Sequence, residues 1–382
     1  MARLGDVGKV VTGNTPKTSD SQNYASNDIC FIKPSDIADG IVTYLNNSEF
    51  YISEYARAKA RVLPPKSVLV TCIGIIGKVA INHVECAFNQ QINAIIPDMS
   101  KCLTEYLAYA IQNKQLEMQD IANAPVVPIL NKTQFSDIEI NLPSLTEQKE
   151  IVEKLNVVSR LIALRKEQLA KLDQLVKSRF IELFGDNNYP SEPLDNNVVE
   201  MFIGPFGSSL KNEVFVDEEN GFCMVYEQKH AIQKTMNVPT RYVPKSKYEE
   251  LKRFTILGGD IIVSCRGTIG EIFIVPDNAP MGIMHPSIMK IRLNTEKYNQ
   301  KFFVFALEQY MDEHNAEAKG SGVKMAVSAT VLGQSDFVVP PMEVQNQFAA
   351  FVEQTDKSKL AIQQSLDKLE LLKKSLMQEY FG

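Results

Sequence analysis

The segment Lys66-Ser-Val-Leu-Val-Thr-Cys72-Ile-Gly74-Ile-Ile-Gly77-Lys-Val-Ala-Ile81 decides the fold, because the chain contains it twice. The second copy reads Gly259-Asp-Ile-Ile-Val-Ser-Cys265-Arg-Gly267-Thr-Ile-Gly270-Glu-Ile-Phe-Ile274. Each copy predicts a buried β-strand, a Gly-x-x-Gly turn and a second strand, since short apolar runs bounded by glycines are typical of hairpins. Glycine suits the turn because it adopts positive φ without steric cost. A hairpin written twice predicts two copies of one domain.

A second repeat lies further along the chain and is longer. Leu142-Pro143-Ser-Leu-Thr-Glu-Gln148 matches Val339-Pro340-Pro-Met-Glu-Val-Gln345, and the match continues without a gap to Phe184-Gly185 and Phe381-Gly382. The duplication therefore predicts a chain of four parts. These are two mixed α/β domains, residues 1–146 and 186–343, and two long helices, residues 147–185 and 344–382.

Apolar residues recur at spacings of three and four in both helical segments, which predicts a coiled-coil seam. The residues expected to pair the helices are Leu155, Ile162, Leu169 and Leu172 in the first and Val352, Ile362, Leu366 and Leu369 in the second. Two such helices in one chain pair most simply antiparallel. The alternative is that each helix covers only its own domain. We therefore expect an α/β (α+β) fold with twisted sheets, in which two domains are separated by two long antiparallel helices and related by pseudo-twofold symmetry.

The composition is that of a globular protein, with 45% hydrophobic and 23% charged residues. The net charge of −6 argues against indiscriminate coating of nucleic acid, although a local basic surface still allows specific binding. Six cysteines lie scattered without a Cys-x-x-Cys motif, which favours free thiols in a reducing compartment. No apolar run reaches membrane-spanning length and no signal-peptide core is present. The expected location is the cytoplasm.

Further motifs occur in both halves in the same order. The first half opens with Leu4-Gly5-Asp6-Val7 and Thr12-Gly13-Asn14-Thr15-Pro16, and the second half has a loose match in Leu194-Asp195-Asn196-Asn197 and Gly204-Pro205-Phe206-Gly207. A further stretch, Phe88-Asn89-Gln90-Gln91, matches Met284-His285-Pro286-Ser287. With the hairpins and helix entries, they make the chain similar to the specificity (S) subunits of type I restriction–modification systems, over essentially its whole length. Two departures exist: the chain has no Trp, and the second half lacks a clean copy of Lys33-Pro-Ser-Asp36.

This resemblance implies that the two α/β domains are target-recognition domains, each reading one half of a split double-stranded DNA site. The helices would act as a spacer and as the docking surface for two modification (methyltransferase) subunits, which restriction subunits with a motor would join. Half-site centres would lie roughly 10 bp apart if both domains read the same face. Methyl transfer to an adenine and cleavage would belong to the partners, with S-adenosylmethionine, ATP and Mg²⁺ bound there and no cofactor bound here.

Catalytic motifs are not found in the sequence, so no catalytic or metal-binding residue is predicted. Gly74-Ile-Ile-Gly77-Lys78 lacks the spacing and the Ser/Thr of a phosphate-binding loop. Methyltransferase motifs are missing. A nuclease motif forced from Pro97-Asp98 and Glu147-Gln-Lys149 is better explained by a carboxylate at a helix start. The four histidines show no metal spacing.

Side chains that suit DNA contacts cluster at corresponding places in the two halves. Arg57 and Lys59 precede the first hairpin, and Lys245 and Lys247 precede the second, where they could neutralise phosphates. The alternative is an ordinary solvated surface. Base contacts need polar side chains on loops. The candidates are Lys17, Lys33, Ser35, Asn89, Gln90 and Gln91 in the first half and Lys211, Lys229, His230, Arg266, His285 and Lys324 in the second.

Two other functions are compatible with these features. The same pair of domains could serve a related, type IIB-like restriction system, which partner genes would distinguish. A coiled-coil interaction scaffold without a DNA role is the alternative from a different class, and absence of DNA binding in a complex with a methyltransferase subunit would favour it.

Overall fold

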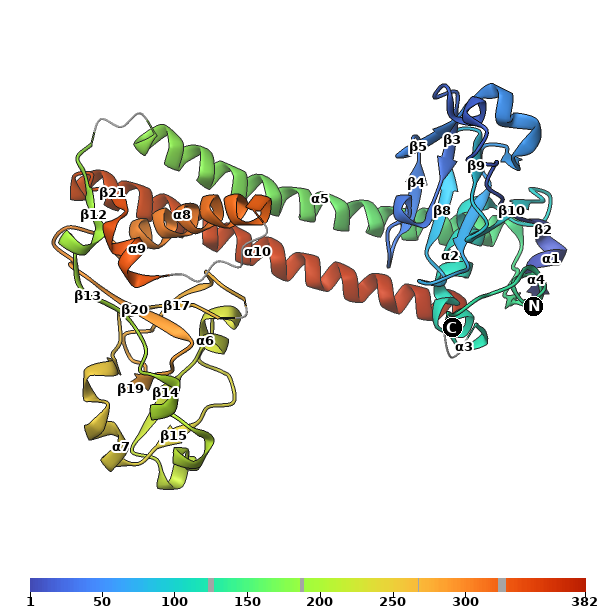
Figure 1. Cartoon of the computed structure of the whole chain (residues 1–382). Helices are drawn as coiled ribbons and strands as arrows, with labels where there is room; N and C mark the ends of the chain where they lie inside the picture. The colour runs from blue at the N-terminus through green and yellow to red at the C-terminus, as the bar shows by residue number, and fades with distance from the viewer. Residues whose placement is uncertain (123–126, 186–188, 267, 322–327) are drawn as a thin grey trace. The chain divides into compact units, whose positions relative to one another are not determined.

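The computed structural model describes residues 1–382 except 123–126, 186–188, 267 and 322–327, and except the side chains of 314–321. The chain forms two units (Figure 1). Unit 1 comprises residues 1–168 and 362–382, and unit 2 comprises residues 169–361. Each unit therefore combines one α/β domain with one end of each long helix.

Unit 1 contains two main sheets and a short strand pair. The larger sheet has the strand order β2–β10–β7–β8–β4 and the smaller the order β5–β3–β9–β6, while β1 pairs with β11. The strands are β1 (Ala2–Arg3), β2 (Gly8–Thr12), β3 (Ile29–Ile32), β4 (Val42–Leu45), β5 (Phe50–Ile52), β6 (Val62–Leu63), β7 (Val68–Thr71), β8 (Val79–Asn82), β9 (Cys86–Phe88), β10 (Ile92–Pro97) and β11 (Glu139–Ile140). Most pairs are antiparallel, but β3–β9 and β4–β8 are parallel.

Among the described residues, unit 2 repeats this arrangement strand for strand, except that β4 has no counterpart. Its sheets have the orders β13–β20–β17–β18 and β15–β14–β19–β16, and β12 pairs with β21. The strands are β12 (Ser191–Pro193), β13 (Val198–Ile203), β14 (Cys223–Tyr226), β15 (Tyr242–Val243), β16 (Thr255–Ile256), β17 (Ile261–Ser264), β18 (Ile272–Ile274), β19 (Gly282–Met284), β20 (Ile288–Leu293) and β21 (Asp336–Val338). The parallel pair β14–β19 corresponds to β3–β9. The predicted duplication is thus confirmed in the strand topology.

The two repeated hairpins, β7–β8 and β17–β18, are confirmed as well. Each is closed by a hydroxyl at the end of its first strand. Thr71 Oγ1 donates to Ile75 O (2.5 Å), and Ser264 Oγ makes the same bond to Thr268 O (2.6 Å). Gly77 and Gly270 adopt φ of +86° and +88°, the left-handed region that favours glycine.

Helices cover the sheets of both units. In unit 1, α2 packs against β7 and β8, and its residues Tyr106 to Ile111 are buried in the core. The shorter helices of the two units are α1 (Leu4–Val7), α2 (Thr104–Asn113), α3 (Gln115–Ile121), α4 (Lys132–Asp137), α6 (Gln228–Gln233), α7 (Lys245–Glu250), α8 (Gln300–Ser321) and α9 (Ala329–Gln334). Phe302, Phe303 and Leu307 of α8 fill the corresponding core of unit 2.

The long helices are α5 (Leu145–Phe184) and α10 (Met342–Phe381), each of 40 residues. Ser144 caps α5, since its backbone N–H donates to Glu147 Oε2 (2.9 Å) and Glu147 N–H donates to Ser144 Oγ (3.3 Å). This reciprocal pair is a capping box, the role expected for a carboxylate at a helix start. Glu147 therefore has a structural function here.

A buried glutamine anchors the first turn of each long helix. Gln148 accepts a hydrogen bond from Leu103 N–H (2.8 Å) and donates to the carbonyls of Lys101 and Pro143 (2.9 Å each). Gln345 makes the same three bonds, to Asn299 (2.8 Å), Lys297 (2.9 Å) and Pro340 (2.7 Å). Both side chains are fully buried. The repeated Leu/Val-Pro-x-x-x-x-Gln motif thus fixes each helix to the domain that precedes it.

Within each unit, the segments of α5 and α10 are antiparallel, as expected. In unit 1, Lys154 contacts Tyr380 and Lys166 pairs with Glu370, so residue numbers rise along α5 as they fall along α10. In unit 2, Asp173 of α5 pairs with Lys359 of α10 (2.6 Å). Among the residues expected to pair the helices, Leu155 and Leu366 are buried, while Ile162, Leu169, Leu172, Val352, Ile362 and Leu369 are half-buried.

The repeated Phe-Gly endings show why one helix does not simply cover one domain. Phe381, at the end of α10, lies in the core of unit 1, where its ring contacts Tyr106. Phe184, at the end of α5, lies in the core of unit 2 against Phe302 and Phe348. Each unit therefore buries the start of one long helix and the end of the other, and the single-domain alternative is wrong.

Candidate nucleic-acid interface

Parallel strands bring two loops together at one edge of each unit, because the carboxyl ends of parallel neighbours lie on the same side of a sheet. In unit 1 these loops are Lys33–Asp36, after β3, and Asn89–Gln91, after β9. In unit 2 they are Glu227–His230, after β14, and His285–Ser287, after β19. We call these two places the loop edges of unit 1 and unit 2. They contain most of the side chains expected to read bases.

The loop edge of unit 1 presents Lys33, Ser35 and Gln90. The backbone N–H of Lys33 donates to Asp36 Oδ2 (2.7 Å), which closes the turn, and Lys33 Nζ lies 3.0 Å from the centre of the Phe50 ring. Ser35 and Gln90 are exposed. Gln90 Oε1 accepts from Thr15 Oγ1 (2.7 Å), which leaves its amide N–H groups available to a ligand.

Asn89 has a structural role in the same loop. It is buried, its Oδ1 accepts from Gln91 N–H (3.1 Å), and its Nδ2 donates to Gln91 Oε1 (2.8 Å). The amide groups of Asn89 therefore satisfy the loop itself, as in an Asx-turn. This arrangement argues against the base contact expected for Asn89. The hydrogen bond from Asn89 Nδ2 also restrains the side chain of Gln91.

His285 does in unit 2 what Asn89 does in unit 1. Its Nδ1 accepts from Ser287 N–H (3.2 Å) and contacts Ser287 Oγ (2.7 Å). The surrounding main-chain bonds are also repeated: Cys72 N–H to Gln91 O and Cys265 N–H to Ser287 O both measure 2.8 Å. The His285 ring is only partly buried, and burial lowers its pKa below the ordinary value, so the neutral, accepting ring is favoured.

The turn after β14 replaces the Lys33-Pro-Ser-Asp36 turn that the sequence of the second half lacks. Glu227 N–H donates to His230 Nδ1 (3.0 Å), in the same i to i+3 relation as Lys33 N–H and Asp36. His230 is fully buried, and burial lowers its pKa. The base contact expected for His230 therefore has no support, because its ring closes a turn inside the domain.

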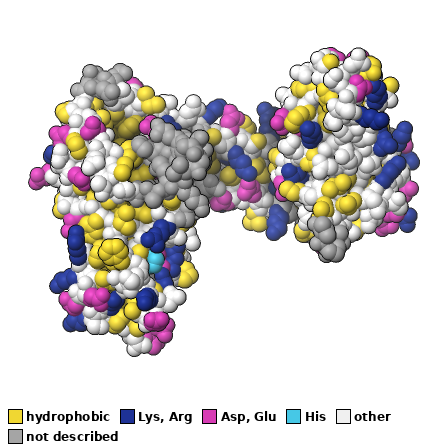
Figure 2. All heavy atoms as spheres, viewed as in Figure 1, with side chains coloured by type: hydrophobic (Ala, Val, Ile, Leu, Met, Phe, Trp, Pro, Cys, Tyr) yellow, Lys and Arg dark blue, Asp and Glu magenta, His cyan; other side chains and the backbone are white. Residues whose placement is uncertain are grey.

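Charged side chains gather around Glu227 at the loop edge of unit 2. Glu227 pairs with Lys229 (2.7 Å) and with Arg241. Burial alone would raise the pKa of Glu227, but the hydrogen bonds from Arg241 and Lys229 hold it below its ordinary value. Arg266, which follows β17, is exposed, and its positive charge contributes to lowering the pKa of His285. Figure 2 shows a histidine beside Lys and Arg side chains on the domain at the left.

Three of the four cations that precede the hairpins form ion pairs with carboxylates. Arg57 pairs with Glu54 and with Glu85 (2.9 Å), and Lys59 pairs with Asp20 (2.9 Å). In unit 2, Lys247 pairs with Glu250 (2.8 Å), while Lys245 is exposed 5.8 Å from the Phe222 ring centre. These surface pairs contribute little stability and exchange readily for phosphate. They nevertheless reduce the local positive charge on which the phosphate hypothesis rests.

The remaining expected base contacts lie apart from the loop edges. Lys17 and Lys211 are exposed on loops after β2 and β13. Lys324 lies outside the described residues.

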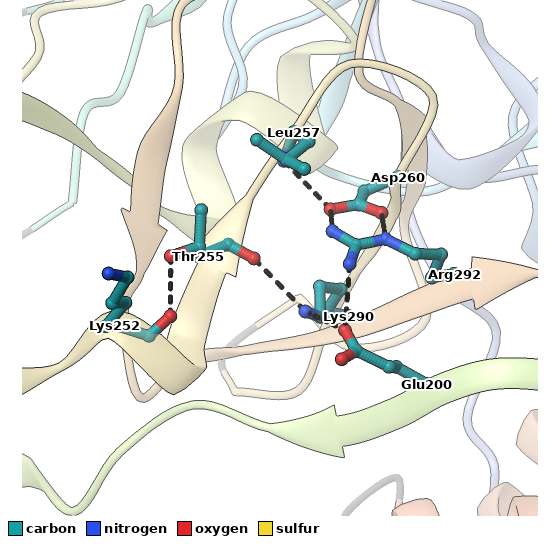
Figure 3. Close-up of polar contacts among 7 residues, drawn as sticks. All are labelled: Glu200, Lys252, Thr255, Leu257, Asp260, Lys290 and Arg292. Atoms are coloured by element: carbon teal, nitrogen blue, oxygen red, sulfur yellow. Dashed lines mark hydrogen bonds and ion pairs between the residues drawn. The ribbon is translucent and has the colours of Figure 1, made fainter.

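A network of four charged residues joins the two main sheets of unit 2 (Figure 3). Lys290 is 1% exposed and donates to Glu200 Oε2 (2.6 Å) and to Thr255 O (3.1 Å). Arg292 makes two parallel bonds of 2.7 Å to Asp260, which is also 1% exposed, and a third to Glu200 (3.1 Å). The hydrogen bond from Lys290 lowers the pKa of Glu200. Such bidentate, charge-assisted bonds are the strong ones in proteins.

Sequence reasoning assigned no structural role to four residues that hold these elements in place. Glu227 and Arg241 organise the loop edge of unit 2; Arg241 belongs to the basic cluster before the second hairpin, but no motif links it to Glu227, 14 residues earlier. Gln148 and Gln345 stood in a repeated motif, and their exact repetition was a signal of a structural role. Within the described ranges, no cluster of three or more His, Cys, Asp or Glu side chains suits a metal, the six cysteines are free and buried, and no helix is long and apolar enough to cross a membrane.

Comparison with known proteins places this architecture in a family. The family model described as type I restriction modification DNA specificity domain matches residues 1–174 and 212–372. The MjaIX specificity subunit of Methanocaldococcus jannaschii is 31% identical over 200 residues, which cover 51% of this chain and 45% of that protein. The HindI specificity subunit of Haemophilus influenzae is 32% identical over 155 residues, which cover 40% of this chain and 32% of that protein. The matched region thus spans less than half of either relative.

Solved structures share the fold over the whole chain. The S subunit of a type I restriction–modification system from M. genitalium aligns with a TM-score of 0.54 at 14% identity, covering 100% of this chain and 95% of that chain. A chain from a structure of the type I R-M system concerned with complex assembly and conformational transition aligns at 0.60 and 15% identity, covering 99% and 96%. The chain belongs to the type I restriction modification DNA specificity domain family.

Proposed function

We propose that this chain is the DNA sequence-specificity subunit of a type I restriction–modification enzyme. The observation that carries the proposal is the duplicated loop edge. Asp36 and His230 close equivalent turns, and Asn89 and His285 stabilise equivalent loops, but the exposed side chains differ between the units. A constant backbone that presents different side chains is what two readers of different half-sites require.

In this proposal each unit reads one half of an asymmetric, bipartite double-stranded DNA site. The amide of Gln90 suits the N6/N7 edge of adenine, and the fork of Arg266 suits the O6/N7 edge of guanine. Lys33 follows β3 at the loop edge of unit 1 and Lys229 follows β14 at the loop edge of unit 2, and in this proposal both supply positive charge next to the phosphates. Arg266 and Gln90 are exposed, so neither needs a buried partner to be displaced before it contacts DNA.

The chemistry belongs to partner subunits in this proposal. Two modification (methyltransferase) subunits dock on α5 and α10 and methylate an adenine in each half-site, after flipping it out of the stack. Restriction subunits with a motor join them. S-adenosylmethionine, ATP and Mg²⁺ are bound by those partners, and the long helices act as the spacer between the two readers.

An exchange of residues 186–340 for the same region of another family member tests the proposal. We expect one half of the methylated target to change and the other half to stay, because each unit reads separately. Methylation mapping of the host genome, with and without the gene, measures both halves at once. The matched control is the reciprocal exchange of residues 1–140, which should change the other half. A chimaera that alters both halves, or a gene whose removal leaves methylation intact, would contradict the proposal.

Removal of one heptad from α5 tests the spacer role. The number of base pairs between the half-sites should change, while both half-site sequences stay the same. Altered half-site sequences would show that the helix contributes to reading and is not a spacer.

A further inference from the structure

A groove of about 480 Å³ lies in unit 1 beside the edge strands of its two main sheets. Strand β2 provides one wall and strand β6 the other, and Ile96 and Lys132 complete the lining. Three cations, Lys9, Arg61 and Lys132, line the groove, and no carboxylate does. All three side chains are exposed.

These three cations differ from Arg57 and Lys59 in having no carboxylate partner among the residues that the structure describes. Among the residues described, neither Lys9 nor Lys132 has a side-chain hydrogen bond or ion pair, whereas Arg57 and Lys59 are paired with carboxylates. Arg61 is held in place by main-chain contacts: its guanidinium donates to Thr12 O, and its backbone N–H donates to Asn14 Oδ1 (2.8 Å). One guanidinium bond leaves most of its donors available.

The corresponding place in unit 2 carries the opposite arrangement. Lys9 lies opposite Ile96 in the β2–β10 pair, and Glu200 lies opposite Arg292 in the equivalent β13–β20 pair. The position of the lysine is thus taken by a glutamate. Glu200 and Asp260 neutralise Lys290 and Arg292 within the protein, so the site in unit 2 needs no external anion.

We propose that the groove of unit 1 binds phosphate groups through Lys9, Arg61 and Lys132. Cations without counter-ions in a concave site attract anions, and the planar fork of arginine matches phosphate oxygens. This inference rests on the proposed function, in which the phosphates are those of the DNA backbone beside the half-site that unit 1 reads. Free phosphate is the other source of the same chemistry.

The path of β2 supports the DNA backbone as the source. The strand runs along the groove and ends at Thr12, and the chain then leads to Thr15, whose hydroxyl donates to Gln90 at the loop edge. A backbone phosphate in the groove would therefore lie near a base that Gln90 can reach. Phosphate contacts fix the position of a reader, while base contacts give its specificity.

The test compares the full chain, co-purified with its modification subunits, with the double variant Lys9→Gln/Lys132→Gln. Loss of two phosphate contacts should lower the slope of log affinity against log salt by about two, on target and unrelated duplexes alike. Between 50 and 200 mM salt, the wild-type affinity should therefore fall about tenfold more than that of the variant. The matched control is Lys66→Gln, which changes an exposed lysine before β7 that does not line the groove and should leave the slope unchanged.

A second arm distinguishes the sources of phosphate. Thermal unfolding of the same proteins is measured with and without inorganic phosphate, against chloride at equal ionic strength. Protection of the wild type that the double variant loses, with an unchanged DNA salt slope, would assign the groove to free phosphate. Unchanged behaviour in both arms would overturn the phosphate site. Failure of the wild type to prefer its target over unrelated DNA would instead contradict the proposed function, whatever the variants do.

Discussion

The edge strand of the larger sheet carries Lys9 in unit 1 and Glu200 in unit 2, although from these residues onward, to Thr12 and to Ile203, the two strands pair in the same register. In unit 1 the adjacent groove holds unpaired cations, and in unit 2 the charges neutralise one another inside the domain. The difference teaches that the same strand topology forms with either charge at this place, while the charge network adds to the stability of unit 2 alone. Main-chain pairing and the core maintain the fold, so the surface of each unit is free to suit a different ligand.

The polar residues that hold the loops occupy equivalent positions in the two units, but the type of residue differs. Asn89 and His285 both accept a hydrogen bond from the backbone two residues further on, and Asp36 and His230 both accept one from three residues before. An acceptor is required at each place, because a buried backbone N–H without a partner is costly. The type of side chain that supplies it is free to vary.

The largest expected difference between the units concerns the buried carboxylate of unit 2. Asp260→Ala should lower the free energy of unfolding by about 3 kcal/mol, because it leaves Arg292 without its bidentate partner. The equivalent change in unit 1, Ser67→Ala, should cost about 1 kcal/mol, since Ser67 Oγ makes one hydrogen bond, to Pro64 O. Urea unfolding followed separately for each unit measures both. Equal losses would contradict the view that unit 2 depends on its charge network.

The helix anchors should instead behave alike in the two units. Gln148→Leu removes three hydrogen bonds to buried backbone groups and should destabilise unit 1 by about 2 kcal/mol. Gln345→Leu should destabilise unit 2 by a similar amount, for the same reason. Hydrogen exchange at the start of α5 and of α10 reports each loss locally. A large effect in one unit only would show that the two anchors are not equivalent.

Acid should affect unit 2 through Glu200. The hydrogen bond from Lys290 lowers the pKa of Glu200 below 4.5, so its stabilising effect is present above pH 4.5 and is lost as the pH falls through the lowered value. Glu200→Gln should therefore lower the melting temperature at pH 7 and approach the wild type in acid. Lys9→Gln, at the equivalent position in unit 1, should follow the wild type throughout. Parallel curves for Glu200→Gln and wild type would count against this assignment.

The smallest effect is expected at His285. Burial lowers its pKa below 6.5, so the neutral ring contributes stability above pH 6.5 that is lost as the pH falls from 6.5 through the lowered value. His285→Asn gives unit 2 the residue that unit 1 has as Asn89, which does not titrate. The variant should lose this part of the pH dependence while keeping its stability near pH 7.5. Melting curves between pH 7.5 and pH 5 measure it, and an unchanged pH dependence would show that the His285 ring does not hold the loop.

The sequence predicted the duplication, the hairpins and the long helices because these features depend on local patterns. Glycine spacing, apolar periodicity and an ungapped repeat ending in Phe184 and Phe381 are all visible in one dimension. It also indicated which loops carry polar side chains. It did not separate Gln90, which is exposed, from its neighbour Asn89, which satisfies its own loop, since exposure depends on residues far along the chain.

Only the tertiary structure decided where the charges act. Arg241 reaches Glu227, Lys290 reaches Glu200 across 90 residues of sequence, and Lys9, Arg61 and Lys132 come from three separate segments to line one groove. Coulombic interactions depend on distance and burial rather than on sequence separation. The sequence by itself determined that the chain is one architecture repeated, while folding determined that one copy keeps its positive charge for a ligand and the other neutralises it.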